Sequence, residues 1–454
     1  MKENFLKWKI NTSHFHPDRK WQFLGNMFQL GLLTFPVIPA VGVVLLSLSA
    51  LATWWKKYRQ IISQPLTWGF AILSILLVIV SSFGYYRTEA YLGLGNLIPQ
   101  FIFFTGISGL IQTPAQLRRI SWILVITSVP VVIFGLVQIL LGWGTDGAVQ
   151  SFLGLAIAPT GNPPGRMSAN FMYANILAAY LTIVFILNLG LLIENFPKKT
   201  NPQSPVPSPQ SLFLIVALLG NALALLLTNS RNGWAIAVFA CLTFAIYLGW
   251  RWLIFIVSGI SGIVLLSAFA PSPIREPFRK IVPYFIWGRL SDEMFGDRPI
   301  PLLRSTQWNF ALSLTQQRPL TGWGLRNFSP LYITKYSSYQ MPIWLGHPHN
   351  LFLMLTAEIG IPATICFCSL VGWIIVQGFL LIRDWSDTSA DKLIFFTHLV
   401  AFFGCILFNT ADVTMFDLRV NALGWLLLAG IWGVVCAKRS KKGNLNGADF
   451  NPSQ

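Results

Sequence analysis

The feature that most constrains this chain is its succession of long apolar segments. They lie near residues 22–55, 66–83, 94–111, 120–142, 171–193, 211–228, 233–249, 252–270, 350–382, 393–409 and 419–436. A helix that crosses a bilayer needs about 20 predominantly apolar residues, and the alternation typical of membrane β-strands is absent. Only 11% of the residues are charged, against about 25% in soluble domains. The sequence therefore predicts an all-α, polytopic helical membrane protein and excludes a soluble enzyme.

Basic residues between the apolar segments set the expected orientation. The first segment contains Pro36 and Pro39, so it forms either one long span or two short ones. Two spans with a cytoplasmic N-terminus place most basic clusters inside, as the positive-inside rule requires. The solution has about 12 transmembrane helices. It comprises a cytoplasmic tail at 1–21, helices 1–9 in 22–270, a periplasmic loop at 271–349, helices 10–12 in 350–436, and a cytoplasmic tail at 437–454.

The net charge of +16 would suggest nucleic acid in a soluble protein. Here the basic residues lie mostly in short segments beside apolar runs, so we expect contact with membrane lipid or lipid-linked phosphate and no nucleic acid. The five cysteines lie within or at the ends of apolar segments, which favours simple packing over disulfides or zinc.

The long outer loop carries nine basic and four acidic residues, and Arg304 is one of the basic ones. Either a long loop escapes the orientation rule, or the outer surface binds an anionic substrate. Arg231 lies in the polar break Leu-Thr-Asn-Ser-Arg-Asn-Gly-Trp between two predicted helices. Its guanidinium could bind phosphate as a fork or simply reach the interface from a helix end. Arg166 lies in another outer segment.

The outer loop ends in Gly-His-Pro-His-Asn at residues 346–350. His349 would therefore stand at the start of a helix, where the helix dipole disfavours imidazolium and leaves a neutral base. The alternative is that His349 or Asn350 only caps the helix. A metal pair of His347 and His349 is a weaker hypothesis, because no third ligand has suitable spacing. Two carboxylates complete the candidates: Glu358 about two turns into the same helix, and Asp412 in the last outward turn.

Five short motifs carry a family resemblance. They are Arg166 to Leu181, Ser230 to Trp234, Arg304 with Trp308, Pro319 to Phe328, and His349-Asn350 followed after nine residues by Gly360. In this order the chain resembles the O-antigen ligase/O-antigen polymerase superfamily, nearest its cyanobacterial members, some of which are labelled as inorganic-carbon transporters. The chain departs from the family pattern at Ala169, Tyr173, Ala174, Asn232, Ala235 and Ala363.

The resemblance implies a metal-independent, inverting glycosyltransferase in the bacterial inner membrane that needs no cofactor. Its donor would be a glycan on undecaprenyl pyrophosphate and its acceptor a lipid A-core, or a further glycan if it is a polymerase. The implied roles are a catalytic base for His349, substrate binding for Arg231, Arg304, Arg166, Asn350 and Asp412, and support from Glu358 and His347.

The competing class is a membrane transporter of the bicarbonate type. A transporter needs polar groups at mid-membrane depth. The polar residues of this chain lie mainly at the outer ends and in the outer loop, with Glu358 and His398 as exceptions. This distribution favours the enzyme.

Overall fold

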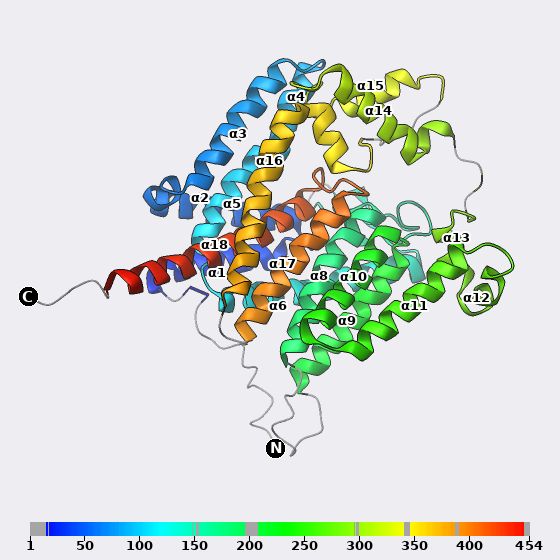
Figure 1. The fold of residues 1–454 in the computed structure, drawn as a ribbon, viewed down its shortest axis with the longest axis horizontal. Coiled ribbons are helices and arrows are strands. Elements are labelled where there is room, and N and C mark those ends of the chain that lie inside the picture. Colours follow the sequence, from blue (N-terminus) through cyan, green and yellow to red (C-terminus); the bar gives the residue numbers. More distant parts are fainter. Residues whose placement is uncertain are drawn as a thin grey trace, which may run out of the picture.

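A computed structural model describes residues 15–448, except for 17, 148, 151–153, 196–207, 295, 297–298, 340–345 and 386–389. The described residues form helices and turns, with no strand among them (Figure 1). The predicted all-α membrane architecture is confirmed. Most of the predicted N-terminal tail, residues 1–14, and the last residues, 449–454, lie outside the described part.

Within the described residues, eleven helices are long and apolar enough to cross a membrane. They are α2 (Pro39–Ile62), α3 (Pro65–Ser82), the run of α4 (Arg87–Gly93), η2 (Leu94–Asn96) and α5 (Ile98–Leu110), α6 (Pro114–Leu141), α8 (Ala174–Asn195), α9 (Pro209–Leu227), α10 (Arg231–Leu248), α11 (Arg251–Phe269), α16 (Leu351–Arg383), α17 (Ala390–Asn409) and α18 (Leu418–Ala448). The first apolar segment does divide in two, because α1 (Gln22–Thr34) ends before α2 begins at Pro39. α1 has only 13 residues, about 20 Å of helix, and so falls short of a full span.

Local sequence explains where several helices start and stop. α6 begins at a capping box, in which the Thr113 hydroxyl accepts from the Gln116 amide and the Gln116 side chain accepts from the Thr113 amide. Pro114 then fits the first helical position, where its missing N–H costs nothing. α10 begins after Ser230, whose hydroxyl accepts from the Gly233 amide, and ends at Gly249 in the left-handed conformation. These ends set the outer and inner limits of the spans.

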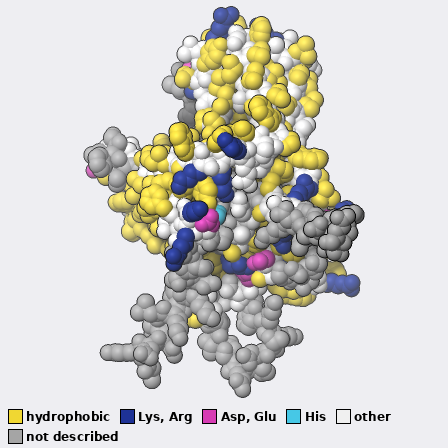
Figure 2. All heavy atoms as spheres, turned by 90° about the vertical axis from the view of Figure 1, so that its left-hand side faces the viewer, with side chains coloured by type: hydrophobic (Ala, Val, Ile, Leu, Met, Phe, Trp, Pro, Cys, Tyr) yellow, Lys and Arg dark blue, Asp and Glu magenta, His cyan; other side chains and the backbone are white. Residues whose placement is uncertain are grey.

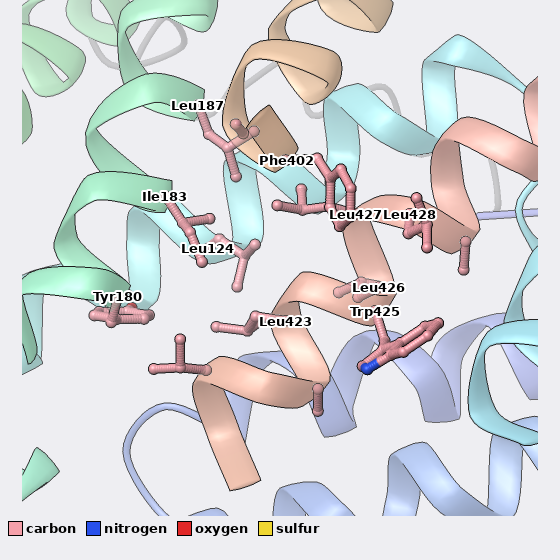
Figure 3. Close-up of a cluster of buried hydrophobic side chains, with 14 of the residues drawn as sticks. Leu124, Tyr180, Ile183, Leu187, Phe402, Leu423, Trp425, Leu426, Leu427 and Leu428 are labelled. Carbon is pink, nitrogen blue, oxygen red and sulfur yellow. The ribbon is translucent and has the colours of Figure 1, made fainter. Parts of the chain in front are cut away.

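The core of the bundle is built around α8, which is buried along most of its length. Figure 3 shows Tyr180 and Ile183 of α8 facing Leu124 of α6, Phe402 of α17 and Leu423 of α18. Truncating a buried leucine in such a core to alanine costs about 2–5 kcal/mol. This packing fixes the N-terminal ends of α8 and α18 and the C-terminal end of α17 relative to one another, and the site described below lies at those ends.

The surface of the bundle is apolar, as expected of a membrane protein. Figure 2 shows hydrophobic side chains over the upper part of one face, with Lys and Arg side chains gathered below them. α11 is mostly exposed and presents Trp252, Phe255 and Ile260 outward. Because the described residues leave these side chains largely exposed, they fit contact with lipid.

The predicted outer loop contains four short α-helices and a 3₁₀ turn. They are α12 (Arg275–Ile281), α13 (Tyr284–Leu290), η4 (Ile300–Leu302), α14 (Arg304–Gln317) and α15 (Phe328–Lys335). Phe310 and Leu314 of α14 form a small second core with Phe328 and Tyr332 of α15 and with Ala357 of α16. This core joins the loop to the start of α16, next to His349.

Candidate functional site

His349 lies immediately before α16, in the left-handed region with φ of 53°. Asn350, and not His349, is the helix cap: its Oδ1 accepts from the Leu353 amide at 3.0 Å, and its Nδ2 donates to the Thr410 carbonyl at 3.0 Å. Both polar groups of Asn350 are therefore used by the protein, which favours a structural role over the predicted substrate-binding one. The His349 side chain is left available for another function.

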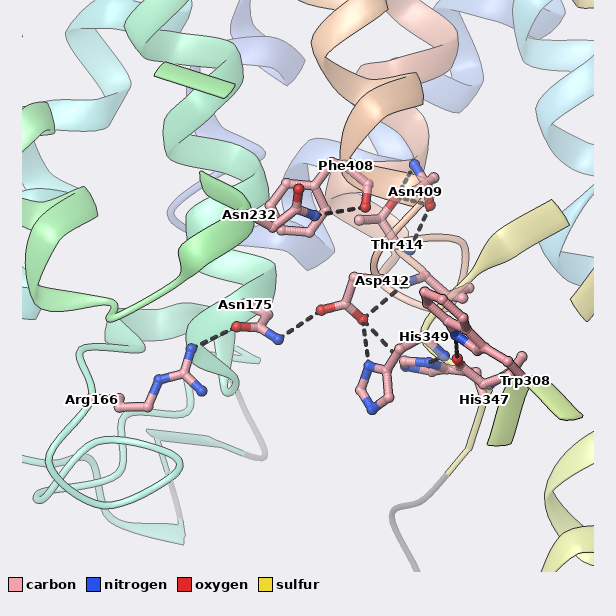
Figure 4. Close-up of polar contacts among 12 residues, drawn as sticks. Arg166, Asn175, Asn232, Trp308, His347, His349, Phe408, Asn409, Asp412 and Thr414 are labelled. Carbon is pink, nitrogen blue, oxygen red and sulfur yellow. Dashed lines mark hydrogen bonds and ion pairs between the residues drawn. The ribbon is translucent and has the colours of Figure 1, made fainter. Parts of the chain in front are cut away.

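A hydrogen-bonded chain connects His349 to the core of the bundle (Figure 4). His349 Nδ1 lies 3.1 Å from Asp412 Oδ1, and Asp412 Oδ2 accepts from Asn175 Nδ2 at 2.7 Å. Asn175 Oδ1 in turn accepts from Arg166 Nη2 at 2.6 Å. The chain links the start of α16 to the turn before α18 and to the first turn of α8. In Figure 4 the second ring nitrogen of His349 points away from Asp412.

Asp412 is the most buried member of this chain, with 2% of its surface exposed. Burial alone would raise the pKa of Asp412, but the hydrogen bond and charge of His349, the nearby His347 and the Val413 amide together hold it below its ordinary value. Asp412 is therefore a carboxylate and receives the Nδ1–H of His349. In a neutral His349 this leaves Nε2 unprotonated and able to accept a proton. Asp412 thus orients a histidine, whereas the sequence had suggested substrate binding.

His347 also faces Asp412. The sequence offered no third ligand for a metal bound by His347 and His349, but the structure brings Asp412 close to both histidines. Its Nε2 lies 3.8 Å from Asp412 Oδ1, and the candidate ligand atoms of His347, His349 and Asp412 lie within 4.8 Å of one another. However, His347 Nδ1 accepts from the His349 amide at 3.2 Å. Neutral His347 then carries its proton on Nε2, the atom that would have to bind the metal, whereas ligating histidines usually donate through their other nitrogen. Burial lowers the pKa of His347 to about 4, so this neutral form prevails near pH 7.

Of the three arginines named from the sequence, Arg166 and Arg304 both interact electrostatically with Asp412. Arg166 donates from Nε to the Thr228 carbonyl at 2.8 Å as well as to Asn175. Arg304 is the first residue of α14, and its guanidinium makes no hydrogen bond or ion pair to another described residue. Burial lowers the pKa of both arginines, yet a guanidinium stays charged in proteins. Their positive field further disfavours a bound cation.

Arg231, the third arginine, is the first residue of α10. Its Nη1 lies 3.0 Å from Asp292 Oδ1, in the turn after α13. Asp412 and Arg231 both interact electrostatically with Arg166 and with Arg304. The arginines of three distant segments therefore lie within electrostatic range of one another, and two of them interact with Asp412.

Two residues of this region were not named as site residues from the sequence. Tyr173 precedes α8 and interacts electrostatically with Asp412, Arg166, Arg304 and Arg289. Burial raises the pKa of Tyr173, so its hydroxyl is a hydrogen-bond donor near neutral pH. Asn175 belongs to the motif from Arg166 to Leu181. The sequence therefore marked its position, but did not assign it a function.

An apolar cavity of about 200 Å³ adjoins the candidate site. Leu351 and Phe352, just after the Asn350 cap, line it together with Asn409 and Thr414. Deeper lining comes from α16, α17 and α18. Its mostly apolar lining suits part of a hydrocarbon chain.

A family model described as O-antigen ligase matches residues 213–368. This match supports the O-antigen ligase superfamily for the chain. The resemblance found in the sequence is confirmed at the level of the superfamily. No curated protein matches the chain. The matched O-antigen ligase segment contains Arg231, Arg304 and His349, whereas Arg166 and Asp412, which complete the site, lie outside it.

The nine-residue spacing of the O-antigen ligase motif has a structural reason. The first segment of α16 runs from Leu351 to Ile359, and at Gly360 the backbone turns out of helical geometry, with φ of 76° and ψ of 168°. A Cβ on Gly360 would lie 2.5 Å from the Leu320 carbonyl oxygen, so glycine is required there. The spacing therefore fixes the length of the helix that separates His349 from this turn.

Glu358 holds the same turn together. Its Oε1 accepts from the Phe328 amide at 3.1 Å, at the start of α15, and its carbonyl accepts from the Gly324 amide at 2.8 Å. The Ile361 amide donates to the Pro319 carbonyl at 2.8 Å. The O-antigen ligase motif from Pro319 to Phe328 is thereby fastened to α16. These contacts use the buried Glu358 carboxylate within the protein, and they favour a structural role over a catalytic or transport role.

At Ala169 the chain departs from the family pattern, and the backbone there lies in the left-handed region that favours glycine. Ala169 has φ of 45°, a region that costs a non-glycine residue about 1–2 kcal/mol. Gln138 Oε1 accepts from the amides of Ser168 and Ala169 at 3.0 and 2.8 Å. The turn before α8 thus keeps its shape without the glycine, and Arg419, which donates to the Asn170 carbonyl at 2.8 Å, supports it from α18.

Proposed function

We propose that this chain is a membrane glycosyltransferase of the O-antigen ligase type. It would move a glycan from an undecaprenyl-pyrophosphate carrier to a lipid A-core or related acceptor. The observation that carries the proposal is the pairing of His349 with the buried carboxylate of Asp412 at 3.1 Å, in a region where three arginines converge. A base near a cluster of cations fits transfer from a diphosphate leaving group.

In this mechanism His349 acts as the general base. Nδ1–H is donated to Asp412, and Nε2 takes the proton of the acceptor hydroxyl. The acceptor oxygen forms a bond to the anomeric carbon while the bond from that carbon to the phosphate oxygen breaks, and the electron pair leaves on the diphosphate. Attack opposite the leaving group inverts the anomeric centre. Asp412 then stabilises the imidazolium that has formed.

The arginines would stabilise the departing diphosphate. Arg304 suits this role best, because its guanidinium is half-buried and makes no hydrogen bond or ion pair with the part of the chain that the structure describes. Arg231 and Arg166 would add donors from α10 and from the segment before α8. Forked donors match phosphate oxygens better than a point charge does, and they supply the charge for which other transferases use Mg²⁺. We therefore propose that no metal or other cofactor is needed.

The apolar cavity beside Leu351 and Phe352 would hold the hydrocarbon chain of a lipid-linked substrate. The positive-inside rule places the loop with α12 to α15 on the periplasmic side of the bacterial inner membrane. Donor carrier and acceptor would then meet at the outer end of the bundle, where His349 lies.

A polysaccharide polymerase of the same superfamily would use the same base and the same leaving group, and would differ only in its acceptor. The surface glycans of a deletion strain separate these outcomes. Loss of long chains with an unmodified lipid core supports the ligase, and chains of a single repeat support the polymerase. Unchanged glycans together with impaired bicarbonate uptake would refute the transferase and favour a transporter.

A further inference from the structure

Arg231 is already held by oxygen atoms of the protein itself. Besides the Asp292 carboxylate at 3.0 Å, its Nη1 contacts the carbonyl oxygens of Arg289 at 3.3 Å and Leu290 at 3.4 Å. These two residues form the last turn of α13. A carboxylate and two carbonyl groups of the predicted outer loop thus occupy Nη1 of Arg231. In the proposed function this guanidinium binds phosphate oxygens.

The segment that carries Asp292 is also fastened to the end of α11. Arg279 of α12 donates to the Ser267 carbonyl at the end of α11 at 3.0 Å, pairs with Glu293 at 2.5 Å, and stacks 3.8 Å over the ring of Trp287. None of these contacts involves Arg231. Asp292 could therefore leave Arg231 while Arg279 keeps α12 and α13 attached to the end of α11.

Asp292 lies where such a movement is easy. Its side chain is 51% exposed, and its backbone lies in the left-handed region with φ of 64°, at the turn that follows α13. Exposed ion pairs contribute little to stability, so a ligand with two or more negative charges can replace a single exposed carboxylate at Arg231.

We propose that Asp292 is an internal competitor for the diphosphate site. Its carboxylate occupies Arg231 until the diphosphate of a lipid-linked donor displaces it, and it returns to Arg231 when the spent carrier leaves. This inference rests on the proposed function and adds a regulatory contact to the same site. Removing the competitor would strengthen diphosphate binding about two- to fivefold, as an exposed ion pair allows.

The test uses the purified full-length protein in detergent, with inorganic pyrophosphate as the probe and calorimetry as the readout. Asp292→Asn removes the charge and keeps a residue that tolerates positive φ, so we expect the Kd to fall about two- to fivefold. Glu293→Gln is the matched control: it removes the same charge one residue away, from a side chain that pairs with Arg279 and Arg275. It should leave the Kd unchanged. In an Arg231→Ala background, Asp292→Asn should have no effect.

Three results would overturn the inference in distinguishable ways. If Asp292→Asn and Glu293→Gln tighten binding equally, a general change of field is the cause and no competition exists. If Arg231→Ala weakens pyrophosphate binding but Asp292→Asn leaves it unchanged, the competitor is refuted while the proposed function stands. If Arg231→Ala leaves pyrophosphate binding intact, the assignment of the donor site in the proposed function fails as well.

Discussion

Replacing Asp412 with asparagine probes the His349–Asp412 pair without changing its size. The carboxylate accepts three hydrogen bonds, from His349 Nδ1, from Asn175 Nδ2 and from the Val413 amide. An amide has one acceptor oxygen, and its NH₂ group would face a donor at one of these positions. With 2% of Asp412 exposed, water cannot replace the lost contact, so we expect a stability loss of about 1–3 kcal/mol.

The effect of Asp412→Asn on transfer should be larger than its effect on stability. If the new amide turns its NH₂ toward His349, Nδ1 must accept and the proton moves to Nε2, which can then no longer act as a base. General-base help is typically worth about 10²–10⁴-fold, and we expect a loss of that order in the transfer rate. The assay is glycan transfer by purified protein, normalised to the folded fraction from thermal unfolding in detergent.

Asp417→Asn is the matched control, because Asp417 lies in the same turn but caps α18 by accepting from the Arg419 and Val420 amides. It should lower stability and leave the transfer rate per folded molecule nearly intact. If Asp412→Asn retains transfer at the level of Asp417→Asn, Asp412 is only a structural acceptor and does not orient His349.

Three further outcomes are expected. Arg231→Lys should impair transfer nearly as much as Arg231→Ala, because an ammonium cannot form the fork, and full transfer by the lysine variant would reduce Arg231 to an interfacial residue. Transfer by purified protein should persist in excess chelator, and activity that is lost with chelator and restored by Mg²⁺ or Mn²⁺ would restore the metal hypothesis for His347 and His349. A cysteine introduced at Ile300 should react with a membrane-impermeant reagent from the periplasmic side, and labelling only from the cytoplasm would invert the topology.

The sequence predicted those features that short stretches of chain determine. The length of the apolar segments predicted the spans, and Pro36 and Pro39 marked the break between α1 and α2. The motif that begins at His349 offered this histidine as the base, which stays a prediction. The sequence also predicted that Arg231, Arg304 and Arg166 belong to one site, through motifs in family order. In the structure Arg166 and Arg304 interact electrostatically with Asp412, and Arg231 interacts with both of these arginines.

Pairings between distant segments could not be read from the sequence. Asp412 lies 63 residues from His349 and 237 from Asn175, and only the packing of α8, α17 and α18 brings them together. The sequence therefore offered Asp412 for substrate binding and gave Asn175 no role. The choice between His349 and Asn350 as the cap was open for a related reason, since it depends on the backbone angles at the start of α16.

The most direct test of the central claim is the transfer rate of His349→Asn. The substitution suits the backbone, because asparagine tolerates the φ of 53° found at His349, and the helix keeps its own cap at Asn350. Asparagine cannot accept a proton from the acceptor hydroxyl. We predict that His349→Asn inserts and folds like the wild type and loses transfer by about 10²-fold or more, with a milder effect of His347→Asn. Transfer by His349→Asn at close to the wild-type rate would contradict the assignment of His349 as the base.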